Sequence, residues 1–121
     1  MNGIGIDLVA IGDVEYSLAE FGDRFLRRVF TGAERRECAG DARRLAARLA
    51  AKEAAIKALR PGPEVPTPPR EIEVVTTPYG PELRLHGGLA ARARARGWRE
   101  PRVSLSHTDC HAVAVVTVEV S

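Results

Sequence analysis

Cysteine is scarce in this chain. Its two cysteines, Cys38 and Cys110, stand alone, and no C-x-x-C pair or other metal-ligand spacing surrounds either of them. The sequence therefore offers no cysteine framework for a zinc site or a disulfide scaffold. This usage fits a reducing cytoplasm, and we expect both thiols to be buried or inert.

The sequence also lacks a long apolar run. No stretch approaches the roughly 20 apolar residues that a membrane-spanning helix needs. The beginning of the chain, MNGIGIDLVAIGDVE, has no basic region before its apolar stretch and contains Asp7. We therefore expect no signal peptide and no membrane partner. The expected location is the cytoplasm.

A strong excess of one charge is missing as well. The chain has 18 basic and 16 acidic residues and a net charge of only +2. A nucleic-acid-binding domain is therefore a weak alternative, because such domains carry a concentrated positive surface. The arginines near Trp98 would surround a helix rather than form one stripe along it: Arg92, Arg94, Arg96 and Arg99.

Lysine is nearly absent. Only two of the basic residues are lysines, and both lie in the stretch Lys52-Glu53-Ala-Ala-Ile-Lys57. A compact ammonium differs chemically from the planar guanidinium that the chain uses elsewhere. The clustering indicates chemistry that requires lysine at this point, and the alternative is chance.

The length and the hydrophobic content of 45% suit one compact domain over residues 1–121. Periodicity predicts strands at 3–9, 71–76, 82–86, 102–106 and 111–119. Helices are predicted at 11–28 (bent or broken near Gly22-Asp23), after the Thr31/Glu34 capping box, at 42–59 after an Asp41 cap, and at 88–96. The proline-rich segment 60–70 should be an irregular connection. The class is α+β, with a mainly antiparallel sheet, one long helix and several short ones on one side.

The first strand has two unlike faces. Side-chain alternation separates Ile4, Ile6 and Leu8 from Gly3, Gly5 and Asp7. We expect the first set to form the packed face and the second a bare face that something approaches closely. Alternatively, Asp7 is a turn-forming residue at the strand end.

The long helix carries charges close to its apolar stripe of Leu45, Leu49, Ile56 and Leu59. Lys52 falls within this stripe, where a charge is costly unless it is paired or directed at a ligand. Glu53 and Lys57 are neighbours on the adjoining face. The alternative is an ordinary salt bridge between these two, with Lys52 reaching out to solvent.

The segment Ser104-Leu105-Ser106-His107-Thr108 is the second candidate element. Alternation points Leu105 inward and both serines to the other face, while His107 lies at the strand end. Asp7 and Glu53 are hard oxygen ligands that suit Mg²⁺, and His107 with the nearby cations suits a polyphosphate. This set favours phosphoryl-type transfer, but spacing alone does not show that its members meet in space.

Three motifs carry a family resemblance. GIGIDLV, ARLAAKEAAIKAL and VSLSHT resemble, in order and spacing, the motifs of the holo-acyl-carrier-protein synthases, which are short, single-repeat 4′-phosphopantetheinyl transferases. EIEV, LHG and AVAVV extend the resemblance over nearly the whole chain. It implies a 4′-phosphopantetheinyl transferase-like fold. It also implies transfer of 4′-phosphopantetheine from coenzyme A to a serine of an acyl or peptidyl carrier protein, with release of adenosine 3′,5′-bisphosphate.

The resemblance also implies roles for individual residues. Asp7 and Glu53 would hold Mg²⁺, or Mn²⁺, together with the coenzyme A diphosphate. Glu53 is the candidate base, Lys57 would balance charge on the leaving phosphate, and His107 completes the catalytic set. The residues expected to contact coenzyme A are Arg48, Lys52, Lys57, Ser106, His107 and Thr108. The family further implies a homotrimer with active sites between subunits.

The chain departs from the family pattern in two places. Ala10 replaces a common glutamate, and the helix after it carries Asp13, Glu15 and Glu20 where relatives are basic. The proline-rich segment 60–70 replaces a glycine-rich loop. Carrier choice (a fatty-acid, polyketide or peptide pathway) and adenosine binding therefore stay open. A non-enzymatic module that binds coenzyme A or carrier protein is the alternative function, and the intact Asp7, Glu53 and Lys57 count against it.

Overall fold

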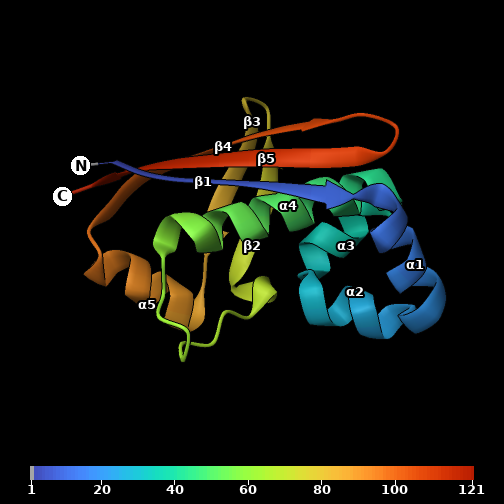
Figure 1. Cartoon of the computed structure of the whole chain (residues 1–121), viewed down its shortest axis with the longest axis horizontal. Helices are drawn as coiled ribbons and strands as arrows, with labels where there is room; N and C mark the ends of the chain where they lie inside the picture. Colours follow the sequence, from blue (N-terminus) through green and yellow to red (C-terminus); the bar gives the residue numbers. More distant parts are fainter. Residues whose placement is uncertain (1) are drawn as a thin grey trace.

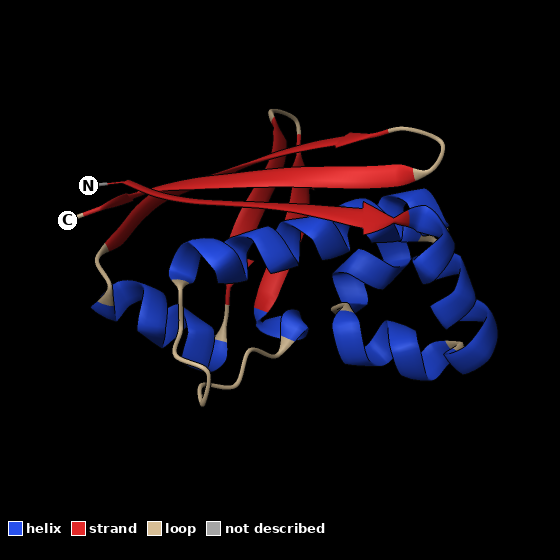
Figure 2. Cartoon of the chain, viewed as in Figure 1, coloured by secondary structure: helices blue, strands red, loops and turns tan. Residues whose placement is uncertain are grey.

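The structure is a computed structural model that describes residues 2–121. Its strands form two sheets rather than the single sheet expected (Figures 1 and 2). Strands β1 (Asn2–Ala10), β5 (His111–Val120) and β4 (Trp98–His107) pair antiparallel in the order β1-β5-β4. Strands β2 (Ile72–Thr77) and β3 (Gly80–Leu85) form a separate hairpin. The mainly antiparallel α+β class is confirmed.

The long helix α4 (Ala42–Leu59) lies along one face of the three-stranded sheet (Figure 1). Alternate residues of β5 face it and are buried: Ala112, Ala114, Val116 and Val118. In the sheet register Asp7 lies opposite Ala114, which lies opposite Leu105 on β4. Leu105 packs against the core, and Ser104 and Ser106 are exposed, as alternation predicts.

The two faces of β1 are reversed relative to the prediction. Ile4, Ile6 and Leu8 are 68%, 60% and 62% exposed. The opposite face, which carries Gly5, packs on α4, because a glycine without a side chain admits the helix backbone directly. A Cβ at Gly5 would lie 2.9 Å from the carbonyl carbon of Ala54. What approaches the glycine face is therefore the chain's own helix.

The helix boundaries follow the sequence signals closely. The break in 11–28 is confirmed, because α1 (Ile11–Phe21) and α2 (Asp23–Val29) meet at Gly22, whose φ is 51°. The capping box at Thr31 opens α3 (Gly32–Cys38), and the Asp41 carboxylate accepts from the first amides of α4. Both caps satisfy amides that have no partner inside the helix.

The chain after α4 forms an irregular segment, the β2–β3 hairpin, helix α5 and the last two strands. The segment after α4 is irregular, as expected, up to one short 3-10 turn, η1 (Pro69–Glu71). Helix α5 (Gly87–Ala95) follows the hairpin and lies at the opposite end of the molecule from α1 and α2 (Figure 1). None of the helices in residues 2–121 is long and apolar enough to cross a membrane.

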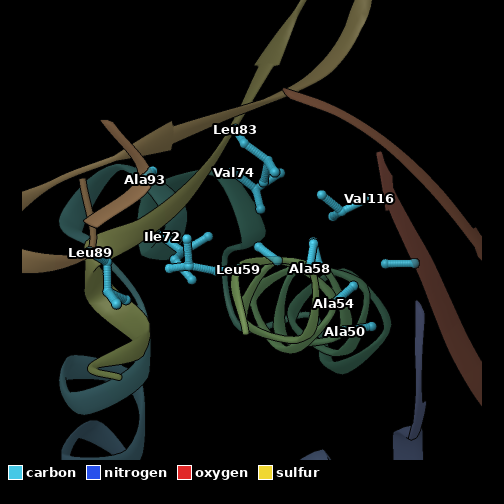
Figure 3. Packing of buried hydrophobic residues seen from close by; sticks show 13 residues of the cluster. Ala50, Ala54, Ala58, Leu59, Ile72, Val74, Leu83, Leu89, Ala93 and Val116 are labelled. Carbon is cyan, nitrogen blue, oxygen red and sulfur yellow. The ribbon is translucent and has the colours of Figure 1, made fainter. Parts of the chain in front are cut away.

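Helix α4 contributes to two apolar clusters along its length. One packs its alanines against the hairpin, α5 and the sheet (Figure 3). The other packs Phe30, Leu45 and Val14 around the first half of α4. The predicted leucine stripe is only part of this packing, because seven alanines of α4 are also buried: Ala46, Ala47, Ala50, Ala51, Ala54, Ala55 and Ala58. Small residues allow α4 to lie close to its neighbours on several sides.

Candidate functional site

Asp7 and Lys57 meet between β1 and α4. Lys57 Nζ donates to Asp7 Oδ1 at 2.8 Å and to the carbonyl oxygen of Ile6 at 3.1 Å. The Asp7 side chain is mostly buried, whereas more than half of Lys57 is exposed. Lys57 thus directs its ammonium across to the strand rather than along its own helix to Glu53. The turn-forming alternative for Asp7 is excluded, because Asp7 lies within β1.

Glu53 lies one turn before Lys57 and completes this cluster. Burial raises the pKa of Glu53, and the negative charge of Asp7 raises it further, while Lys57 lowers it. The two carboxylates are therefore close enough to repel each other. A cation placed between them would relieve that repulsion.

The donor set is suited to Mg²⁺ rather than Zn²⁺. Two carboxylates meet here, and residues 2–121 contain no cluster of three His, Cys, Asp or Glu side chains that could hold a metal. Structural zinc sites need four protein ligands. Mg²⁺ is commonly bound by one or two carboxylates, with waters and substrate phosphates completing its shell. Asp7 and Glu53 fit that pattern.

The predicted contact of Lys52 with coenzyme A is wrong. Its side chain is fully buried, and its ammonium donates to Glu34 Oε1 at 2.7 Å, to the Ile72 carbonyl at 2.6 Å and to the Pro69 carbonyl at 3.1 Å. All three protons of the ammonium are thus taken within the fold. Lys52 is not available to coenzyme A, and the pairing that its apolar position required is internal.

The partner of Lys52, Glu34, is a residue that sequence reasoning assigned only to helix capping. It closes the capping box with Thr31 and is itself fully buried. Its second carboxylate oxygen accepts from the amide of Val74 at 2.9 Å. Glu34 therefore joins α3, α4 and β2. The sequence indicated only that Lys52, in its apolar position, needs an acidic partner, and it did not identify Glu34 as that partner.

Arg48 and His107 line a hollow between the start of α4 and the end of β4. The hollow has a volume of about 310 Å³ and is lined by Asp41, Arg43, Arg44, Ala47, Arg48, Leu105, Ser106 and His107. Arg48 is nearly buried and bonds Glu37 and Thr76 through Nη2, at 2.9 and 3.1 Å. Its Nε has no hydrogen-bond partner in residues 2–121. Arg43 and Arg44 are basic residues of this hollow that the sequence reasoning did not select.

Thr108 holds the turn between β4 and β5. Its hydroxyl oxygen accepts from the amides of Cys110 and His111 at 3.1 and 3.0 Å. The neighbouring His107 is exposed. This turn also exposes Cys110, so of the two thiols expected to be buried or inert only Cys38 is buried, and burial raises the pKa of Cys38 to about 11.

The chain does not bring all the candidate residues together. Asp7 and His107 lie on the two outer strands of the sheet, with β5 between them. Two strand spacings correspond to about 10 Å, and His107 lies opposite Ala112 rather than Ala114. Asp7, Glu53 and Lys57 thus form one half-site, and Arg48, Ser106 and His107 form a second.

Comparisons with known proteins agree over nearly the whole chain. The model of the 4′-phosphopantetheinyl transferase superfamily matches residues 3–116. The chain is 43% identical to a holo-acyl-carrier-protein synthase of Koribacter versatilis over 121 residues, with 97% of each protein covered.

Solved structures give the same result. The ACPS–CoA complex of Chronobacterium ammoniagenes has a TM-score of 0.86 and 31% identity, covering 100% of this chain and 98% of that one. The acyl carrier protein synthase of Mycobacterium tuberculosis has a TM-score of 0.78 and 39% identity, covering 98% and 97%. The fold expected from the sequence motifs is confirmed.

Proposed function

Because the chain belongs to the 4′-phosphopantetheinyl transferase superfamily, we propose that it transfers 4′-phosphopantetheine from coenzyme A to a serine of a carrier protein. The relative described above, which matches the chain over nearly the full length of both proteins, is a holo-acyl-carrier-protein synthase. The observation that carries the proposal is the meeting of Asp7, Glu53 and Lys57, two carboxylates and one ammonium, at one edge of α4.

Asp7 and Glu53 are the residues that would hold Mg²⁺ or Mn²⁺. The bound ion would neutralise charge on the coenzyme A diphosphate and polarise the phosphorus under attack. Burial raises the pKa of Glu53, and the negative charge of Asp7 raises it further, so the two carboxylates are close enough for one cation to serve both.

The side chains of the half-site formed by Asp7, Glu53 and Lys57 carry out the remaining steps. The carrier serine oxygen forms a bond to the phosphorus that bears pantetheine, and the bond from that phosphorus to the bridging diphosphate oxygen breaks. Adenosine 3′,5′-bisphosphate leaves with the bridging oxygen, and Lys57 balances the charge on it. Glu53, one helical turn from Lys57, would accept the serine proton as the general base.

The second half-site is expected to act from a neighbouring subunit. The exposed residues Ile4, Ile6 and Leu8 form an apolar strip on the outer face of β1, and such a surface favours burial against another chain. We infer a homotrimer, the assembly that the family resemblance implies, in which this face is covered. Arg48, Ser106 and His107 of one chain would then bind coenzyme A phosphates beside Asp7 and Glu53 of the next.

The test of this function uses the purified chain, coenzyme A, Mg²⁺ and the apo carrier proteins of the same genome. Under single-turnover conditions, with enzyme in excess, intact-mass measurement should show one carrier gaining a phosphopantetheine group. If the chain binds coenzyme A but no carrier gains mass, the transferase is wrong and the non-enzymatic binding module replaces it. The same experiment identifies the pathway that the enzyme serves.

A further inference from the structure

Strand β1 and helix α4 are in close contact at Gly5, beside the proposed metal site. A Cβ on Gly5 would clash with the carbonyl oxygen of Ala54 and lie 2.8 Å from the amide nitrogen of Ala58. Ordinary contacts of a Cβ fall between 3.4 and 4 Å. Because these are backbone atoms of α4, no side chain can rotate away to make room. Only glycine at position 5 allows the helix to lie this close to the strand.

This contact lies next to both carboxylate residues of the site in the sequence. Gly5 precedes Asp7 by two residues on the same face of β1, and Ala54 directly follows Glu53. The separation of the Asp7 and Glu53 carboxylates is therefore set by the spacing that Gly5 permits. Lys57 crosses the same gap to reach Asp7 and the Ile6 carbonyl.

We propose that Gly5 is a positioning residue, which sets the distance at which Asp7 and Glu53 bind one divalent cation together. The proposal rests on the proposed function and deepens it. Glycine weakens a strand, where β-branched residues are favoured, so its presence here needs a reason of this kind. Alanine at position 5 would force α4 away from β1, and a displacement of about 1 Å near a reacting centre costs about 100-fold in rate.

Two other glycines serve as matched controls. A Cβ on Gly3, on the same face of β1, would lie 2.8 Å from the Val118 side chain, which can shift, and 3.5 Å from the Ala58 carbonyl oxygen, an ordinary contact. A Cβ on Gly12, in α1, would meet nothing within 4 Å. The same chemical change therefore meets rigid backbone at position 5, a movable side chain at position 3 and open space at position 12.

The experiment measures Mn²⁺ binding by the electron paramagnetic resonance of free Mn²⁺, with coenzyme A present, together with the single-turnover rate. Gly5→Ala should raise the Mn²⁺ dissociation constant at least about tenfold, the loss typical when support for a metal ligand is removed. Gly3→Ala and Gly12→Ala should stay within about twofold of the native protein, because neither moves the ligands. A purely structural role would reduce the amount of folded protein and leave its Mn²⁺ affinity unchanged.

Native Mn²⁺ affinity in a folded Gly5→Ala protein overturns the proposal. Should Gly5→Ala fail to fold, Gly3→Val replaces it, because its larger side chain extends toward the Ala58 carbonyl. Gly3→Val must then bind Mn²⁺ more weakly than Gly3→Ala, and equal affinities overturn the proposal.

Asp7→Ala separates this question from the proposed function. If Asp7→Ala binds Mn²⁺ as the native protein does, the metal site itself is wrong, and the role of Gly5 is overturned with it. If Asp7→Ala loses Mn²⁺ while Gly5→Ala retains it, only the role of Gly5 is lost.

Discussion

Lys57 Nζ lies 2.8 Å from Asp7 Oδ1, so a cation from the long helix is paired with a carboxylate from the first strand. These residues are 50 positions apart in the sequence. This contact brings two motifs that are distant in the sequence together in one half-site. Glu53 lies one helical turn before Lys57. The ammonium is also bonded to the Ile6 carbonyl, which fixes it beside the strand.

Replacing Lys57 with arginine should keep the charge and lose much of the turnover. A planar guanidinium cannot place one compact charge between the Ile6 carbonyl and Asp7. We expect kcat for carrier modification to fall by about 10- to 100-fold, the range of a lost positioned interaction. Arg84→Lys on the exposed face of β3 is the control for the Lys–Arg difference. Unchanged kinetics of Lys57→Arg would show that the clustering of lysine is accidental.

Lys52→Met should destabilise the fold by about 3–5 kcal/mol, because it leaves the buried Glu34 carboxylate without its counter-charge. Urea unfolding followed by circular dichroism measures this effect. The double variant Glu34→Gln with Lys52→Met should recover part of the loss, since no buried charge is left unpaired. If Lys52→Met is as stable as the native protein but binds coenzyme A poorly, Lys52 contacts the ligand after all.

The sequence predicted the elements well because their boundaries depend on local chemistry. The Asp41 cap and the Thr31–Glu34 box satisfy helix amides within a few residues, so a short window contains the information. Residue chemistry selected Asp7, Glu53 and Lys57, and the motif resemblance implied that they form one site. That Asp7 and Lys57 pair directly, across 50 residues, is visible only in the structure.

Two interpretations failed because they depended on tertiary packing. Hydrophobicity alone placed Ile4, Ile6 and Leu8 inside, but the absence of a side chain at Gly5 decided which face α4 covers. The resemblance implied that Lys52 contacts coenzyme A, whereas its place in the apolar stripe required only that it be paired or directed at a ligand. Its partner, Glu34, lies 18 residues earlier, and its carbonyl partners are Pro69, near the end of the proline-rich segment, and Ile72, just after it.

Mixing two inactive variants should restore activity if the half-sites come from different chains. Glu53→Ala inactivates one half-site and His107→Ala the other, and β5 separates them within one chain. Mixed assemblies would contain some interfaces with both halves intact. Light scattering should give a mass three times 13.1 kDa. A monomer at micromolar concentration, or no recovery in refolded mixtures, contradicts the shared site.

Charge reversal on α2 should weaken carrier binding. Arg27 and Arg28 are exposed, and a hollow between α1 and α2 is lined by Ser17, Phe21, Arg24, Phe25 and Arg28. Carrier proteins usually present an acidic helix, and the acidic residues of α1 leave these arginines as the complementary surface. Arg27→Glu with Arg28→Glu should raise KM for the carrier, flatten its salt dependence and leave KM for coenzyme A unchanged.

The control for this prediction is Arg94→Glu, an exposed arginine on α5 at the other end of the molecule (Figure 1). It changes the net charge without touching α2, and carrier kinetics should stay near native. Unaltered carrier kinetics in the α2 variant would place the docking surface elsewhere.

The central claim is that Asp7 and Glu53 hold a divalent cation for phosphopantetheine transfer, and single-turnover mass measurement of the carrier tests it most directly. The native chain should convert the carrier fully with Mg²⁺ and not at all in excess chelator. Asp7→Ala and Glu53→Ala, folded by circular dichroism, should each lose most of the conversion, while Glu82→Ala on the exposed face of β3 keeps it. Native conversion rates in excess chelator, or in either folded variant, would contradict the account.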